Sequence, residues 1–87
     1  MPYITQQRRT SIANGEQPGS SGELNYQLTQ VIRTYLLACG ATSLGITYAT
    51  LNDIIGALDA CKLEFYRRVV VPYEERKRVA NGDIYDF

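Results

Sequence analysis

The residues best suited to hold a ligand lie in the second half of the sequence, where basic and aromatic side chains alternate. They are Lys62, Tyr66, Arg67, Arg68 and Tyr73. On a helix, residues four apart share a face, which places Lys62 beside Tyr66. Guanidinium groups bind phosphate through paired hydrogen bonds, and tyrosine rings stack on nucleobases. The set predicts a pocket for a nucleotide-type small molecule, assembled across a subunit interface.

The same segment has a second interpretation, a solvated surface of ion pairs. Glu64 lies three residues before Arg67 and four before Arg68, and Asp59 lies three before Lys62. These spacings join opposite charges along one helix. Both interpretations stay open, because the sequence does not decide whether the arginine side chains meet a ligand or their neighbours.

Catalysis is not expected of this chain. Its 87 residues include no His and only two Cys, which excludes a histidine general base, a Ser-His-Asp triad and a Cys/His or four-Cys zinc site. A carboxylate mechanism or a Mg²⁺ site needs converging acids. Asp53 and Glu64 share a helix face but lie about 16 Å apart along the axis. We therefore expect a non-enzymatic protein with no cofactor and no metal.

The charge balance argues against nucleic acid as the partner. Nine basic and nine acidic residues give a formal net charge of zero, whereas bulk attraction to a polyanion needs excess positive charge. The cluster Arg76, Lys77 and Arg78 lies in the last turn of an expected helix, where it complements the helix dipole. Together with Arg8 and Arg9 it leaves weak nucleic-acid binding as a third hypothesis.

Hydrophobic periodicity predicts an all-α fold with helices at about 22–39, 50–70 and 72–80. Ser20 and Glu23 form a capping box before the first helix. The first two helices are expected to form an antiparallel hairpin. Residues 1–21 are expected to form an extended or flexible N-terminal arm, because 6–22 are polar and rich in Gly, Ser, Asn and Gln, and residues 22–87 are expected to form the helical domain.

The ends of the later helices follow from local signals. Thr50 and Asp53 form a second capping pattern. Pro72 cannot donate a backbone hydrogen bond and should push Val71 out of helical geometry, so we expect a kink and a short third helix. The Asn81-Gly82 pair predicts where that helix stops.

The second helix is apolar on more than one face, and one preceding helix cannot cover them all. Glycine inside a helix costs about 1 kcal/mol relative to alanine, which suggests close approach of a neighbouring backbone. A chain this short also has a small core, for which oligomerisation is a common remedy. We expect a homo-oligomer, with a dimer as the minimum. The expected interface residues are Ile54, Gly56, Leu58, Leu63, Phe65 and Val70.

The sequence shows no targeting or membrane segment. The first residues, MPYITQQRRTS, lack the apolar core of a secretory signal, and no apolar run approaches the length of a membrane span. We therefore expect no membrane contact, and we expect Cys39 and Cys61 to be reduced thiols in a cytoplasm.

Six short motifs resemble a family of small proteins encoded by bacteriophages and bacteria, which carries a domain-of-unknown-function label. They are PYI at 2–4, GELNY at 22–26, LNDIIGAL at 51–58, KLEFYRR at 62–68, PYE at 72–74 and NGD at 81–83. The resemblance implies a phage or bacterial setting, which for a phage protein is the host cytoplasm.

Two functions from different classes follow. The first is a small oligomeric binding protein, in a more specific form one that sequesters a nucleotide-type signal of antiphage defence in pockets between subunits. The alternative is a structural or protein-interaction role, either as a virion component or as an inhibitor of a host protein.

Overall fold

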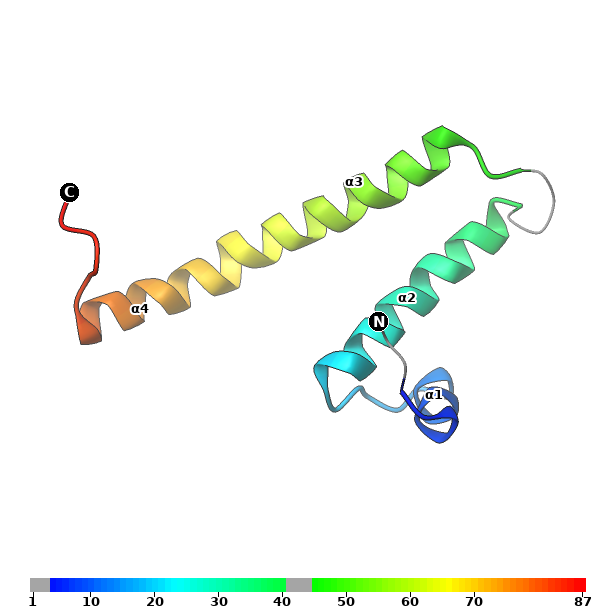
Figure 1. The fold of residues 1–87 in the computed structure, drawn as a ribbon, viewed down its shortest axis with the longest axis horizontal. Helices are drawn as coiled ribbons and strands as arrows, with labels where there is room; N and C mark the ends of the chain where they lie inside the picture. The colour runs from blue at the N-terminus through cyan, green and yellow to red at the C-terminus, as the bar shows by residue number, and fades with distance from the viewer. Residues whose placement is uncertain (1–3, 41–44) are drawn as a thin grey trace. The chain divides into compact units, whose positions relative to one another are not determined.

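The computed structural model describes residues 4–40 and 45–87, and all regular secondary structure within these ranges is helical. The predicted all-α class is therefore confirmed for the described part of the chain. Contacts divide the protein into two compact units, Met1–Thr50 and Leu51–Phe87, which are described separately. Figure 1 shows helices α1 and α2, followed by one continuous helical stretch labelled α3 and α4.

Helix α1 (Gln6–Ala13) corrects the expectation of an extended arm over residues 1–21. Residues 1–3 of that arm lie outside the described residues. The Thr5 hydroxyl accepts a hydrogen bond from the Arg8 backbone N–H at 3.2 Å and caps the helix. Ile12 is the one buried residue of the described chain, with 6% of its surface exposed. The apolar stripe that would have revealed α1 is missing, because one isoleucine makes its contact with α2.

Helix α2 (Ser21–Ala38) begins and ends within one residue of the predicted positions. The Ser20 hydroxyl accepts the Glu23 N–H at 3.2 Å, as the capping box predicts. The Glu23 carboxylate bonds the Gly19 N–H at 2.9 Å. Gly40 ends the helix with φ of 86°, a conformation that only glycine adopts at little cost.

The long helix runs without interruption from Tyr48 to Asn81. It consists of α3 (Tyr48–Phe65), a π-helical segment η1 (Tyr66–Val70) and α4 (Val71–Asn81). The predicted cap at Thr50 is wrong by three residues, because the Thr47 hydroxyl accepts the Thr50 N–H at 3.2 Å. The predicted stop is confirmed, since Gly82 has φ of 90° and bonds the Arg78 carbonyl.

The sequence led us to expect that Pro72 would push Val71 out of helical geometry, and this expectation is wrong. Val71 has φ of −59° and ψ of −50°, and its N–H bonds the carbonyl of Tyr66, five residues earlier. A π turn is wider than an α turn and leaves more room for the proline ring beside the preceding turn. The helix therefore accommodates Pro72 by widening, and the expected break between two separate helices is absent.

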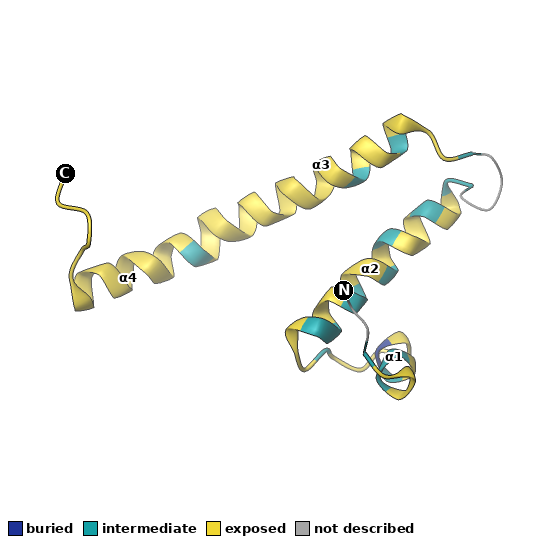
Figure 2. Ribbon diagram, in the orientation of Figure 1, coloured by how far each residue is buried: buried dark blue, intermediate teal, exposed yellow. Residues whose placement is uncertain are grey.

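The unit Leu51–Phe87 has no core of its own. Figure 2 shows almost all of this part of the chain as exposed, and only Ile54 and Val70 are half-buried. Large apolar residues such as Leu63 and Phe65 expose 50% and 57% of their surface. None of the described helices is both long and apolar enough to cross a bilayer.

Candidate functional site

The predicted ligand-binding residues all lie on the continuous helix. Lys62 is in α3, Tyr66, Arg67 and Arg68 are in the π-helical segment η1, and Tyr73 is in α4. All five are exposed. The segment that departs from regular α-helix is therefore also the one with the highest density of candidate residues, and π turns recur at functional sites.

The two arginines share one carboxylate. Arg67 Nη2 lies 3.0 Å from Glu64 Oε2, and Arg68 Nη1 lies 3.4 Å from Glu64 Oε1. Lys62 makes no ion pair within residues 4–40 and 45–87, so the expected pairing with Asp59 is not formed there. Solvent-exposed pairs of this kind contribute about 0–1 kcal/mol. Two guanidinium groups at one carboxylate leave an excess of positive charge that a phosphate group would complement.

Tyr73 is not grouped with the other four residues. Its ring lies under the Arg76 guanidinium, with 5.9 Å to the ring centroid, and under the Lys77 ammonium, at 5.6 Å. These are cation–π distances. Tyr73 thus belongs with the basic cluster of α4. This contact could have been predicted from the sequence, because Arg76 and Lys77 follow Tyr73 by three and four residues on one helix.

The rest of the basic cluster is matched by acids. Arg78 bonds Glu75 at 2.7 Å and Asp83 at 3.4 Å. These acids raise the pKa of the Arg78 guanidinium, with the hydrogen bond to Glu75 as the largest cause. The excess of positive charge on α4 that could attract nucleic acid is therefore small.

Arg8 forms the strongest ionic contact of the unit Met1–Thr50. Its Nη2 and Nε bond the two oxygens of Glu23 at 2.7 and 3.0 Å, and its Nη1 bonds Glu16 at 2.8 Å. This fork geometry is the stronger kind of charged hydrogen bond. The Arg8 side chain, followed by the Gly19 N–H, lowers the pKa of Glu23 to about 2. The contact fixes α1 on α2, and no short-range spacing could have revealed it.

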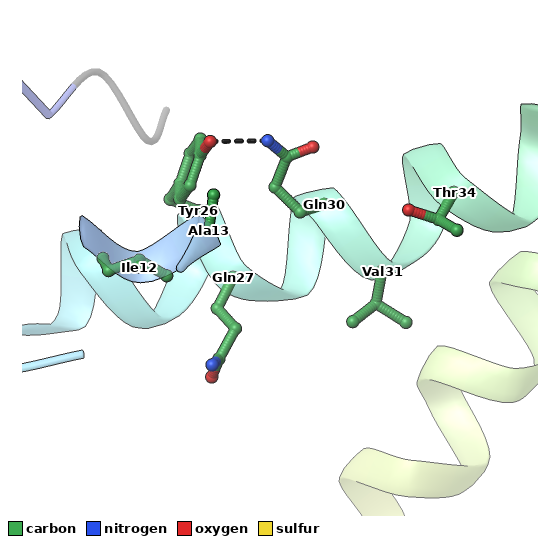
Figure 3. Close-up of a pocket in the computed structure, with 7 residues that line it drawn as sticks. All are labelled: Ile12, Ala13, Tyr26, Gln27, Gln30, Val31 and Thr34. Atoms are coloured by element: carbon green, nitrogen blue, oxygen red, sulfur yellow. Dashed lines mark hydrogen bonds between the residues drawn. The ribbon is translucent and has the colours of Figure 1, made fainter. Parts of the chain in front are cut away.

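An open hollow lies between α1 and α2, with a volume of about 340 Å³ (Figure 3). Its lining includes the apolar side chains of Ile12 and Val31 and the side-chain amides of Gln27 and Gln30. The Gln30 side-chain amide donates a hydrogen bond to the Tyr26 hydroxyl. No charged side chain lines the hollow, so it offers nothing to a phosphate.

The C-terminal residues carry exposed aromatic and aliphatic groups. The rings of Tyr85 and Phe87 meet edge to face at 5.7 Å between centroids. The Tyr85 N–H donates to the Asp83 carboxylate at 3.0 Å. Ile84 and Phe87 are almost fully exposed, so the tail offers apolar surface.

Within residues 4–40 and 45–87, no three His, Cys, Asp or Glu side chains come close enough to hold a metal ion. The thiols of Cys39 and Cys61 are both free; Cys39 is half-buried and Cys61 is exposed.

The predicted interface residues occupy more than one face of the long helix. Leu58, Leu63 and Phe65 are exposed. A Cβ added at Gly56 would meet no atom within 4 Å, so nothing in the described chain explains the glycine.

Comparison with known proteins leads to a single family. No curated protein and no solved structure gives a significant match to the chain. Residues 1–84 match the family described as a domain of unknown function, DUF6899. The match covers almost the whole sequence, including α1, α2 and the continuous helix, and on this basis the chain belongs to the DUF6899 family.

Proposed function

We propose that this protein is a non-enzymatic binding protein that acts as a homo-oligomer, with the helix Tyr48–Asn81 as its assembly surface. The supporting observation is the exposure of large apolar residues on more than one face of that helix, which is exposed over almost its whole length (Figure 2). Apolar surface removed from water stabilises by about 25 cal/mol per Å². An isolated helix is marginal in water, so a helix with this surface gains its stability from packing against partners.

The proposed subunit is a hairpin. In this subunit helix α2 would pack antiparallel to α3, on the face that carries Leu51, Leu58 and Phe65. The face that carries Leu63 then remains for another copy of the chain. This arrangement accounts for a helix that is apolar on two sides.

The proposed ligand is a nucleotide-type small molecule. Arg67 and Arg68 would hold its phosphate, Lys62 would add charge, and Tyr66 or Tyr73 would stack on its base. The local excess of cations around Glu64 supports this choice. In the setting that the sequence motifs suggest, a phage protein in the host cytoplasm, such binding would sequester a signal of antiphage defence.

Isothermal titration tests the ligand, with cyclic nucleotides and ADP-ribose derivatives as the panel. We expect heat of binding from at least one compound, and loss of at least tenfold in affinity in the double variant Arg67→Ala/Arg68→Ala, since each charged hydrogen bond contributes about 1.5–3 kcal/mol. Arg33→Ala, which removes a charge from α2, is the matched control. No heat from any compound, at protein concentrations well above micromolar, would remove the ligand proposal.

Sedimentation equilibrium tests the assembly. We expect a mass above that of one chain, and Leu63→Glu should shift the distribution toward the monomer because it places charge on an apolar contact. A wild-type protein that stays monomeric at hundreds of micromolar would contradict the proposed function.

A protein-interaction role is the alternative, and the exposed tail favours it. Ile84 and Phe87 provide an apolar end to the chain that nothing in its own unit covers. Mass spectrometry of purified virions and affinity capture from infected cells would test the virion and inhibitor versions. The variant Ile84→Ser/Phe87→Ser should lose the captured partner if the tail is the contact, and an unchanged capture would exclude the tail.

Weak nucleic-acid binding remains the third hypothesis. It predicts a gel shift whose affinity falls steeply as salt concentration rises. The pairing of Arg78 with Glu75 and Asp83 counts against it. No shift at low salt would exclude it.

A further inference from the structure

The hollow between α1 and α2 (Figure 3) is a partly apolar site that the described chain leaves open. Ile12 and Val31 lie in its lining, and Val31 exposes 65% of its surface. The volume of about 340 Å³ is at the lower end of the range for ligand pockets. This size suits one large apolar side chain of a partner, and no charge in the lining opposes such a group.

Two polar groups at this hollow lack a full set of partners in the part of the chain that the structure describes. The Gln27 side chain makes no hydrogen bond there, and the residue is half-buried. Arg9 precedes Ile12 and Ala13 by three and four residues and so shares their side of α1. Its guanidinium donates to the Gln6 amide at 2.7 Å but forms no ion pair with any described residue. A matching partner would bring an apolar ring, peptide groups for Gln27 and a carboxylate for Arg9.

The C-terminal residues carry all three of these groups. Phe87 is fully exposed, and Ile84 is almost fully exposed. Asp86 forms no ion pair within residues 4–40 and 45–87, whereas Asp83 lies 3.4 Å from Arg78. Residues 82–87 are not helical, so their peptide groups are not used in a helix. The exposed apolar side chains of α3, by contrast, project from a backbone whose hydrogen bonds are already made.

We infer that the hollow between α1 and α2 holds the tail 84–87 of a second copy, with the Phe87 ring against Ile12 and Val31 and the Asp86 carboxylate beside Arg9. The inference rests on the proposed function for the second copy and for the hairpin subunit. It adds a contact between copies that lies outside the long helix. Complementary charge and apolar surface identify the tail as the occupant.

The length of the long helix requires the tail to come from another copy. Gln30 lies eight residues before the end of α2, so in the proposed hairpin it lies opposite a residue near Gly56. From there to Asn81 the helix rises about 37 Å. The residues 82–87 span at most about 20 Å. The tail of the same chain therefore falls short of its own hollow.

Paramagnetic relaxation between copies tests the contact, in a Cys39→Ala/Cys61→Ala background with helix content checked by circular dichroism. A copy that carries a nitroxide at Ile84→Cys is mixed with an isotope-labelled copy that carries none. We expect broadening of the Gln27 and Gln30 amide signals, and no broadening with a diamagnetic analogue of the label. Because the nitroxide and the isotope are on different chains, only a contact between copies gives this result.

Substitutions in the tail test its two anchors. Asp86→Arg in the nitroxide copy should weaken the interaction at least threefold, as measured from the concentration dependence of the broadening, because an attraction becomes a repulsion. Arg9→Asp in the labelled copy should restore it. Phe87→Ala should weaken the interaction about tenfold, since it removes the ring that fills the hollow. Both tail residues are exposed, so these two changes leave the fold intact. A contact that neither change weakens would overturn the inference.

The relaxation experiment separates this inference from the proposed function. An intact oligomer without broadening at Gln27 and Gln30 would overturn the tail contact and leave the proposed function standing. Broadening that appears only when the nitroxide and the isotope are on the same chain would mean that the tail folds back on its own copy, which also overturns it. A wild-type protein that stays monomeric would overturn both.

Discussion

At the scale of residues, the Arg8–Glu23 ion pair is the clearest contact that forms only when the chain folds. The two residues are fifteen positions apart, and two hydrogen bonds of 2.7 and 3.0 Å join them. Glu23 also accepts the Gly19 N–H, and only 15% of its side chain is exposed. One carboxylate therefore connects the helix α1, the loop and the start of α2.

Acidification should open this contact. The pKa of Glu23 falls from its ordinary 4.5 to about 2 in the folded protein, so the carboxylate stabilises the fold above pH 4.5, and the stabilisation is lost as the pH falls toward 2. We expect the Gly19 amide to exchange faster with solvent across this window. The variant Glu23→Gln should lack that pH dependence. Unchanged protection of Gly19 in the wild type down to pH 2 would contradict the assignment.

The burial of Ile12 makes a second prediction at this scale. Ile12→Ala should destabilise the unit Met1–Thr50 by about 2 kcal/mol, the lower end of the range for removing a buried isoleucine, because the site lies at the edge of an open hollow. Val31→Ala, at a residue that is 65% exposed, is the control and should cost under about 0.5 kcal/mol. Urea unfolding monitored at Tyr26 measures both. Equal effects would show that Ile12 is not the core contact.

At the scale of elements, Pro72 and the π-helical segment η1 form one feature. The N–H of Val71 bonds the Tyr66 carbonyl, and the helix continues through the proline without leaving helical dihedral angles. An inserted residue turns everything after it by about 100° around the axis. The π turn therefore sets the direction of α4 side chains, Tyr73 included, relative to those of α3.

Pro72→Ala should remove the π turn. Alanine restores a backbone donor and has a helix propensity about 3 kcal/mol better than proline, of which we expect roughly 1–2 kcal/mol as a gain because the π turn already relieves part of the clash. Carbon chemical shifts and cross-hydrogen-bond couplings would report a regular α-helix across 66–70. Retention of the Val71-to-Tyr66 hydrogen bond in this variant would show that the π turn has another cause.

At the scale of the whole molecule, the main feature is apolar surface that the described chain does not cover. The unit Leu51–Phe87 carries Leu58, Leu63 and Phe65 in exposed positions and has no buried residue. Marginal stability is normal for small domains, and one without a core depends on contacts beyond itself. We therefore expect this unit to gain its stability by assembly with other copies of the chain, as the proposed function requires.

The variant Gly56→Ala distinguishes an assembled protein from an isolated helix, because it should stabilise the second and destabilise the first. In a monomer alanine should stabilise by about 1 kcal/mol, because its Cβ meets no atom of the chain. In an assembled protein whose neighbouring copy packs closely on Gly56, the same change should weaken association, because the added methyl group would take up that space. Sedimentation and thermal unfolding at two protein concentrations measure the two effects. Stabilisation that does not depend on concentration would contradict close packing at Gly56.

Local signals predicted most of the fold. The capping box at Ser20 and Glu23 and the stop at Gly82 are confirmed, because each depends on residues within one turn of the helix end. Thr47 was missed as a cap because Thr50 offers the same chemistry three residues later. Helix α1 was missed because its stability comes from contacts of Ile12 and Arg8 with a distant segment, which leave no periodic pattern.

The sequence by itself determined the helical class, both ends of α2, the C-terminal end of the long helix and the density of cations at 62–68, since hydrogen bonds and side-chain spacing over three or four residues decide all of these. Only the three-dimensional structure decided that Arg8 binds Glu23 and that a π turn accommodates Pro72. These contacts compete with local alternatives of similar energy. The outcome is settled by which side chains the folded backbone brings within reach.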